Sequence, residues 1–193
     1  MLKLYGLTKS RALRCIWMLY EIDAPFELVR LSPEAPDFPV GSDINPNRKI
    51  PALVDGPTVM WESMAINLYL AQTRTTELSP RGRTELGDAL KWTLWAQSEL
   101  EEFFNKTGSL DAIPPEWASR TIGVLETTLQ KHAFLMADRF TVADLNVSCM
   151  FLGPVSSQLS LDAFASTKRW RNACWTRPAC ERALREALDP AYP

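Results

Sequence analysis

Histidine is nearly absent from this sequence, and its scarcity excludes one common class of site. His132 is the only histidine, and the four cysteines form neither a CxxC pair nor any spacing typical of metal ligands. A metal centre built on imidazoles or paired thiolates is therefore not expected. The scattered cysteines fit free thiols in a reducing cytoplasm.

The chain also lacks an excess of positive charge and a long apolar run. Its 21 basic and 23 acidic residues give a formal net charge of -2, which offers no electrostatic basis for binding nucleic acid or an anionic membrane. The apolar stretch at residues 1–6 is too short for a signal peptide, and no segment has the length of a membrane span. We expect a cytoplasmic protein without nucleic-acid or membrane partners.

The first part of the chain alternates between strand and helix patterns. Leu2–Tyr5 alternates apolar and polar residues and predicts a strand, whereas apolar residues recur at helical spacing from Ser10 to about Asp23. Phe26–Leu31 alternates again, so a second strand parallel to the first completes a βαβ unit. The proline-rich stretch from Ser32 to Asp43 predicts an irregular loop.

A proline opens the next predicted strand. Pro51 offers no backbone N–H to a sheet, and a cis Ile50–Pro51 bond would turn the backbone of Ile50 outward, where it can pair with an extended peptide. Residues 54–57 predict a tight hairpin turn, and residues 58–61 the return strand. Ser63 is placed to cap the apolar helix that follows.

The second part of the chain is helical in period. A polar linker over residues 72–83 precedes it, and helices are predicted over residues 84–105, 115–134, 145–152, 160–175 and 178–188. The first of these is long, and its inward face is predicted to carry Leu86, Leu90, Leu94 and Trp95. Thr141 and Asp144 have the spacing of a capping-box variant at the head of a buried helix. We assign Asp144 to folding.

Two segments resemble the glutathione-binding half of the glutathione transferase superfamily. They run from Asn45 to Leu53 and from Glu62 to Ile66, and the family pattern is Asn-Pro-x-Gly-Lys-Val-Pro-x-Leu followed by Glu-Ser-x-Ala-Ile. This chain departs from the pattern at Arg48, where many members carry glycine. The resemblance spans the whole chain and implies a thioredoxin-like α/β N-terminal domain over residues 1–75 and an all-α C-terminal domain over residues 84–193.

The resemblance also extends to the run from Ser10 to Arg14, which is similar to the serine-type active-site segment of bacterial and fungal members. There the Ser10 hydroxyl would donate to a thiolate at a helix N-terminus, where the dipole lowers a thiol pKa from about 8.5. A plain cap is the other role for Ser10, and Thr8 is the alternative catalytic hydroxyl, since loop length decides which side chain faces the site. Arg11 and Arg14 either face solvent or hold a carboxylate. Cys15 is expected to be buried and inert.

The glutathione-binding residues implied by the resemblance are Lys49, Ile50, Pro51, Glu62 and Ser63. Ser63 and a helix N-terminus suit the α-carboxylate of a γ-glutamyl group, while Glu62 suits its ammonium. The backbone of Ile50 would pair with the cysteinyl part of the tripeptide. Lys49 would reach the glycine carboxylate or stay in solvent.

The implied protein is a cytosolic, detoxifying glutathione transferase. Glutathione is the expected co-substrate, without a metal, and its thiolate would attack an apolar electrophile held against the helical domain. Two alternatives stay open: a glutathione-dependent isomerase, dehalogenase or peroxidase using the same site, or a transferase-like module that binds ligands without turnover. A homodimer is also implied, with an apolar helix face around Met64 and Tyr69 as local support.

Overall fold

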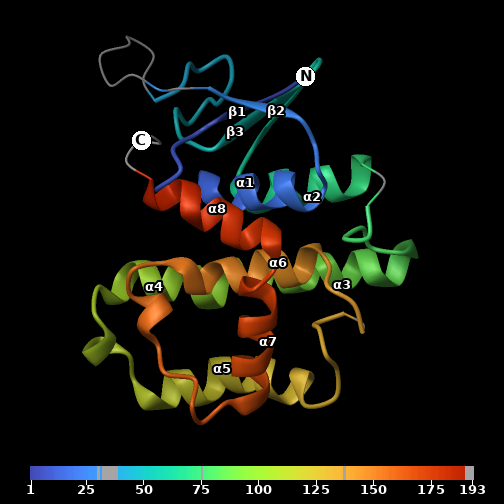
Figure 1. Ribbon diagram of the computed structural model, residues 1–193. Coiled ribbons are helices and arrows are strands. Elements are labelled where there is room, and N and C mark those ends of the chain that lie inside the picture. The colour runs from blue at the N-terminus through green and yellow to red at the C-terminus, as the bar shows by residue number, and fades with distance from the viewer. Residues whose placement is uncertain (30, 32–38, 75, 137, 190–193) are drawn as a thin grey trace. The chain divides into compact units, whose positions relative to one another are not determined.

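The computed structural model describes residues 1–29, 31, 39–74, 76–136 and 138–189. The chain forms two compact units (Figure 1). The first contains Met1–Thr76 together with Arg177–Pro193, and the second contains Glu77–Thr176. The C-terminal segment was predicted to belong to the helical domain over residues 84–193. The described residues of that segment, 177–189, make their contacts with the first unit, while the predicted domain bounds stay a prediction.

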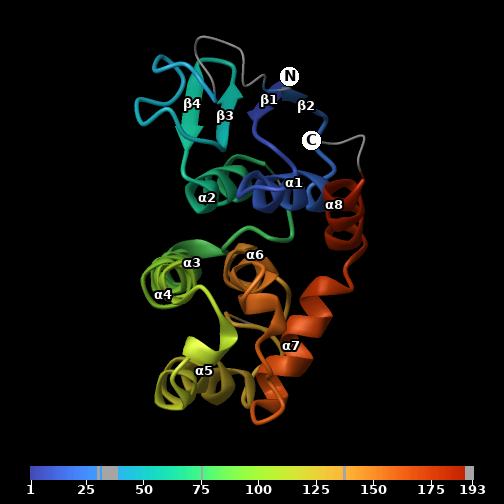
Figure 2. The same cartoon turned by 90° about the vertical axis from the view of Figure 1, so that its left-hand side faces the viewer.

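The first unit is built on a four-stranded sheet. Its strands are β1 (Leu2–Tyr5), β2 (Phe26–Val29), β3 (Ala52–Asp55) and β4 (Thr58–Trp61), in the order β2-β1-β3-β4. β1 and β2 are parallel, whereas β3 pairs antiparallel with both β1 and β4. Helices α1 (Ala12–Glu21) and α2 (Ser63–Thr73) pack together on one side of this sheet (Figure 2). This is the predicted thioredoxin-like arrangement; the predicted loop at residues 32–43 lies largely outside the described residues.

Helix α8 (Pro178–Leu188) packs against α1 within the first unit. Arg177 forms a bidentate ion pair with Glu21, in which Nε and Nη2 each donate to the carboxylate at 2.7 Å. The Trp17 indole N–H donates to the same carboxylate at 2.8 Å. The Arg182 guanidinium lies over the Tyr20 ring, 3.9 Å from its centroid. A planar guanidinium can use both donors on one carboxylate, which fixes the start of α8 on α1.

The hairpin of β3 and β4 follows the prediction. The Ile50–Pro51 bond is cis, and the register runs from the pair Ala52–Trp61 to the pair Asp55–Thr58. Arg48 occupies the position where the family pattern has glycine, and its φ of 52° lies in the left-handed region that favours glycine. The turn before it is held by Asn45, whose amide donates to the Lys49 carbonyl at 2.7 Å and accepts the Asn47 N–H at 2.9 Å. The loop thus keeps a glycine-like geometry without the glycine.

The second unit is helical. Its α-helices are α3 (Gly82–Trp95), α4 (Glu102–Thr107), α5 (Pro115–Leu129), α6 (Val142–Ser148) and α7 (Ala165–Trp175), and its shorter elements are the π-helical η1 (Ala96–Glu101) and the 3₁₀ turns η2 (Leu110–Ala112), η3 (Cys149–Leu152) and η4 (Ser156–Gln158). The long helix predicted over residues 84–105 is therefore α3 and α4 with a π-helical segment between them. In Figures 1 and 2, α3 runs beside α6.

The predicted inward face of the long helix is wrong at Leu90 and Leu94, while Leu86 and Trp95 are half-buried. Leu90 and Leu94 are 44% and 66% exposed, while the buried positions include Ala89, Trp92 and Ala96. Small alanines on the packed face allow α3 to approach α6 closely, and the buried Asn146 amide donates to Thr93 Oγ1 at 3.1 Å across that contact. Two apolar stripes run along the helix, and the alanine-containing stripe faces the core.

The head of α6 carries the predicted capping box. The Asp144 carboxylate accepts the Thr141 N–H and hydroxyl, both at 2.9 Å. It also accepts the Leu135 N–H at 2.8 Å and the Trp170 indole N–H at 2.9 Å. Asp144 has no exposed surface. Its carboxylate therefore joins three segments of the second unit.

Candidate functional site

The loop from β1 to α1 holds the predicted catalytic hydroxyls. Ser10 Oγ donates to the Leu7 carbonyl at 2.7 Å and accepts the Ala12 N–H at 3.1 Å, so it closes the start of α1 as a cap does. To stabilise a thiolate, the hydroxyl hydrogen would have to leave the Leu7 carbonyl. A hydrogen bond to a charged acceptor is roughly twice as strong as one to a neutral acceptor. Ser10 is partly exposed, whereas Thr8 is 1% exposed.

Two local features shape this loop. A Cβ at Gly6 would overlap the Cβ of Ala12, so only glycine allows the end of β1 to approach the first residue of α1 this closely. The first turn of α1 contains no acidic residue, so its positive dipole end is not neutralised from within the helix. An anion at this helix start is therefore favoured electrostatically.

The segment before β3 contains the three residues predicted to bind the middle and the glycine end of glutathione. Pro51 is buried and Ile50 is half-buried, while the Lys49 side chain is exposed. The backbone of Lys49 is fixed because its carbonyl accepts the Asn45 amide. Asn45 was part of the recognised motif but had no predicted role. The sequence feature that could have indicated this role is the dipeptide formed by Asn45 and the proline that follows it, which is typical of turns.

The N-terminus of α2 differs from the prediction. Ser63 is the first helical residue, not the residue that caps the helix; Glu62 occupies the cap position, with φ 69° and ψ 113°. Such a backbone conformation is strained in a residue other than glycine, and strained residues of this kind cluster at functional sites. The first intrahelical bond runs from the Ile66 N–H to the Glu62 carbonyl. Glu62 is exposed, and Ser63 is 5% exposed.

Helix α1 holds the start of α2 through two neighbouring residues. Arg14 Nη1 donates to Ser63 Oγ at 3.4 Å, and the Cys15 thiol donates to the Ser63 carbonyl at 3.5 Å. Cys15 has no exposed surface, and burial raises the pKa of its thiol far above the usual value even though Arg14 opposes the shift. Cys15 therefore stays a protonated, buried thiol. The contact with Arg14 singles out one of the two arginines that the sequence left undecided.

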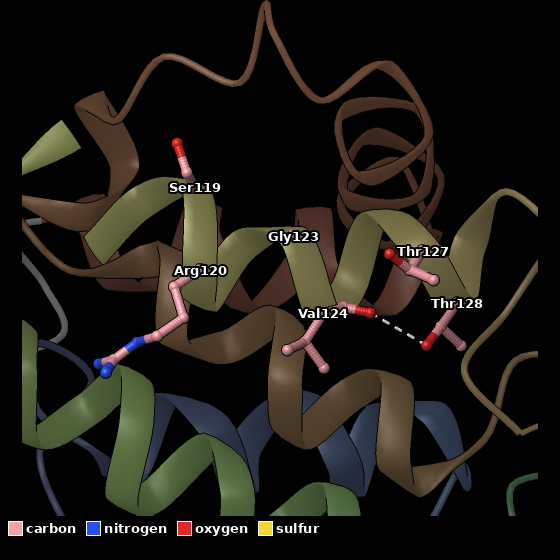
Figure 3. A pocket seen from close by; sticks show the side chains of 6 residues that line it. All are labelled: Ser119, Arg120, Gly123, Val124, Thr127 and Thr128. Atoms are coloured by element: carbon pink, nitrogen blue, oxygen red, sulfur yellow. Dashed lines mark hydrogen bonds between the residues drawn. The ribbon is translucent and has the colours of Figure 1, made fainter. Parts of the chain in front are cut away.

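A shallow hollow on the surface of α5 contains none of the predicted site residues (Figure 3). It is lined by Ser119, Arg120, Gly123, Val124, Thr127 and Thr128. All six residues belong to one helix, and the Thr128 hydroxyl donates back to the Val124 carbonyl at 3.0 Å. The hydroxyl is thus satisfied within its own helix, so the hollow has the features of an ordinary helix surface.

Within the described part of the chain, no group of three or more histidine, cysteine, aspartate or glutamate residues is arranged to hold a metal ion. No helix among the described residues is both long enough and apolar enough to cross a membrane.

Comparison with known proteins covers both units. Residues 1–72 match the N-terminal domain of the glutathione S-transferase family, and residues 116–178 match its C-terminal domain. Together the two matches span more than half of the chain.

Individual relatives agree with this match. A probable glutathione S-transferase of Oryza sativa subsp. japonica is 29% identical, with 98% of this chain and 99% of the rice protein covered. Disulfide-bond oxidoreductase YfcG of Escherichia coli (strain K12) is 26% identical, with 75% of each covered. The structure of Ure2p5 from Phanerochaete chrysosporium, cocrystallized with 1-(S-glutathionyl)-2,4-dinitrobenzene, is 26% identical with a TM-score of 0.78, covering 97% of this chain and 94% of the fungal chain. This chain belongs to the glutathione S-transferase family.

Proposed function

We propose that the first unit binds glutathione and that the protein conjugates the glutathione sulfur to an apolar electrophile. The observation that carries the proposal is the joining of two helix starts. Arg14 and Cys15 of α1 hold Ser63 at the start of α2, and Ser10 lies at the start of α1. One helix N-terminus is suited to a carboxylate and the other to a thiolate.

Recognition of glutathione is assigned to the predicted residues. The Ser63 hydroxyl and the first N–H groups of α2 suit the α-carboxylate of the γ-glutamyl group, and the exposed Glu62 carboxylate suits its ammonium. The backbone of Ile50, which is half-buried beside the buried Pro51, suits the amides of the cysteinyl residue. Lys49 is exposed, and we assign it to the glycine carboxylate.

The chemical step needs a thiolate. The glutathione thiol gives its proton to solvent, and the remaining sulfur lone pair forms a carbon–sulfur bond to the electrophile as a leaving group departs with its electrons. The Ser10 hydroxyl and the positive end of α1 stabilise the thiolate before the attack, which lowers the pKa of the thiol. Neither a metal nor a covalent enzyme intermediate takes part in this scheme.

Binding is tested first. Calorimetry should detect glutathione binding to the wild-type protein, and Glu62→Gln or Ser63→Ala should weaken it by about 1.5–3 kcal/mol without unfolding the chain, since each variant removes a bond to a charged group. Turnover is tested next with 1-chloro-2,4-dinitrobenzene. Unchanged affinity in both variants would refute the assigned glutathione site.

A second reaction is favoured by the relatives in Escherichia coli that are named disulfide-bond oxidoreductases. The four cysteines of this chain are buried, so glutathione itself would have to supply the reactive thiol. An assay with hydroxyethyl disulfide separates the two activities. Turnover of the disulfide without conjugation of the dinitrobenzene would reassign the reaction, while binding without either turnover would indicate a non-catalytic module.

We also propose a cytoplasmic homodimer. The apolar face predicted around Met64 and Tyr69 does not support it, because Met64 is 4% exposed within its own chain and the Tyr69 hydroxyl donates to Asp55 at 3.0 Å. Exposed apolar side chains lie instead on α3, at Leu90 and Leu94. The proposal rests on the family.

A further inference from the structure

Arg14 lies beside the residue that the proposed function assigns to the α-carboxylate of glutathione. It is half-buried, and its Nη1 donates to Ser63 Oγ across 49 residues of sequence. A donor N–H pointed at a serine oxygen uses one of the lone pairs on that oxygen. The serine hydrogen is then left to point away from the guanidinium and toward an acceptor on the other side.

We propose that Arg14 is a positioning residue for the α-carboxylate, acting through Ser63. Its N–H orients the Ser63 hydroxyl outward as a donor, and its positive charge favours an anion at the start of α2. This inference rests on the proposed glutathione site and adds to it a residue from a different helix.

The surrounding structure supports an electrostatic role for Arg14. The first turn of α1 contains no acidic side chain, and neither does the first turn of α2. A basic residue near a helix N-terminus opposes the helix dipole, so the placement of Arg14 works against the stability of α1. A bound carboxylate would relieve that repulsion and would interact favourably with both helix starts.

The purely structural alternative is that Arg14 only ties α1 to α2. The Cys15 thiol already makes a second tie between the same helices, through the Ser63 carbonyl. Loss of a purely structural contact would weaken the affinity for every ligand of the site equally. Loss of a carboxylate-positioning residue would weaken the affinity only for ligands that carry the α-carboxylate. The two roles are therefore distinguished by comparing ligands with and without that carboxylate.

The test compares glutathione with 4-aminobutyryl-cysteinyl-glycine, which keeps the amine but lacks the α-carboxylate. By calorimetry, Arg14→Gln should lose about ten- to a hundredfold in affinity for glutathione. It should bind the analogue as the wild type does, and Arg14→Lys should recover part of the lost affinity. Arg11→Gln is the matched control, because it removes the same charge from the exposed start of the same helix, and it should leave both affinities nearly unchanged.

Two further variants complete the design. Glu62→Gln should weaken both ligands, since both carry the amine. Arg14→Gln combined with Ser63→Ala should lose little more than Ser63→Ala alone, because Arg14 acts through the Ser63 hydroxyl.

Equal losses for glutathione and the analogue in Arg14→Gln, or no loss for either, would overturn the inference. Failure of the wild-type protein to bind glutathione would instead overturn the proposed function, so the two failures are distinguishable.

Discussion

Replacing Asp144 with alanine should destabilise the protein far more than the loss of an ordinary helix cap. The carboxylate accepts hydrogen bonds from the Thr141 N–H and hydroxyl, from the Leu135 N–H and from the Trp170 indole. The side chain is completely buried. Truncation therefore leaves several donors without an acceptor in a region that bulk water does not reach.

The magnitude follows from these contacts. The cap alone is worth about 0.5–2 kcal/mol. Each further buried donor left unsatisfied costs about 1–3 kcal/mol, which here applies to Leu135 and Trp170. Allowing for partial relaxation, Asp144→Ala should lose about 3–5 kcal/mol, a large share of the roughly 5–15 kcal/mol by which domains are stable. Asp144→Asn keeps one acceptor oxygen and should lose less.

Urea unfolding at neutral pH, followed by both circular dichroism and tryptophan fluorescence, measures this loss. An Asp144→Ala protein within about 0.5 kcal/mol of the wild type would refute the structural assignment. A stable variant that binds glutathione normally but has no activity would instead assign Asp144 to the chemistry.

Three further predictions concern stability and assembly. Glu126 accepts the Ser166 and Thr167 N–H groups at the start of α7; burial opposes its ionisation, but these bonds and the Thr167 hydroxyl lower the pKa of Glu126. Glu126→Gln should therefore lower the free energy of unfolding by about 1 kcal/mol above about pH 5. The difference between wild type and variant should shrink as the pH falls through the lowered pKa of Glu126. A difference that does not depend on pH would contradict this prediction. Arg48→Gly should raise the free energy of unfolding, measured in urea, by about 0.5–1 kcal/mol. Glycine removes the strain of a non-glycine residue in the left-handed region, and this gain exceeds the entropy that glycine adds to the unfolded chain. A lower free energy of unfolding would show that the Arg48 side chain stabilises the folded state. Sedimentation at micromolar concentration should show a species of twice 21.8 kDa, and a monomer alone would exclude the dimer.

The parts of the fold that the sequence predicts well are those set by local chemistry. α8 begins where the sequence indicates, because Pro178 suits the first position of a helix. The hairpin follows from Gly56 at its turn, whose φ is 57°. The capping box at α6 follows from the spacing of Thr141 and Asp144 alone.

The parts that the sequence does not predict depend on contacts between distant residues. The placement of α8 depends on the pairing of Glu21 with Arg177, which lie 156 residues apart. The start of α2 is set by the positive φ of Glu62, and α1 holds Ser63 there through Arg14. No local propensity indicates either contact, so Ser63 was predicted as a cap although it is the first helical residue. The roles of Lys49, Ile50 and Ser10 in binding and catalysis stay predictions.

The pH titration of bound glutathione tests the central claim most directly. Thiolate absorbance in the ultraviolet should show a thiol pKa well below the value of about 8.5 for a free thiol. In Ser10→Ala that pKa should rise by about one unit or more, equivalent to about 1.4 kcal/mol, while the affinity for glutathione changes little. Thr8→Ala should have a much smaller effect. A Ser10→Ala titration identical to that of the wild type would contradict the account, and a shift in Thr8→Ala alone would identify Thr8 as the catalytic hydroxyl.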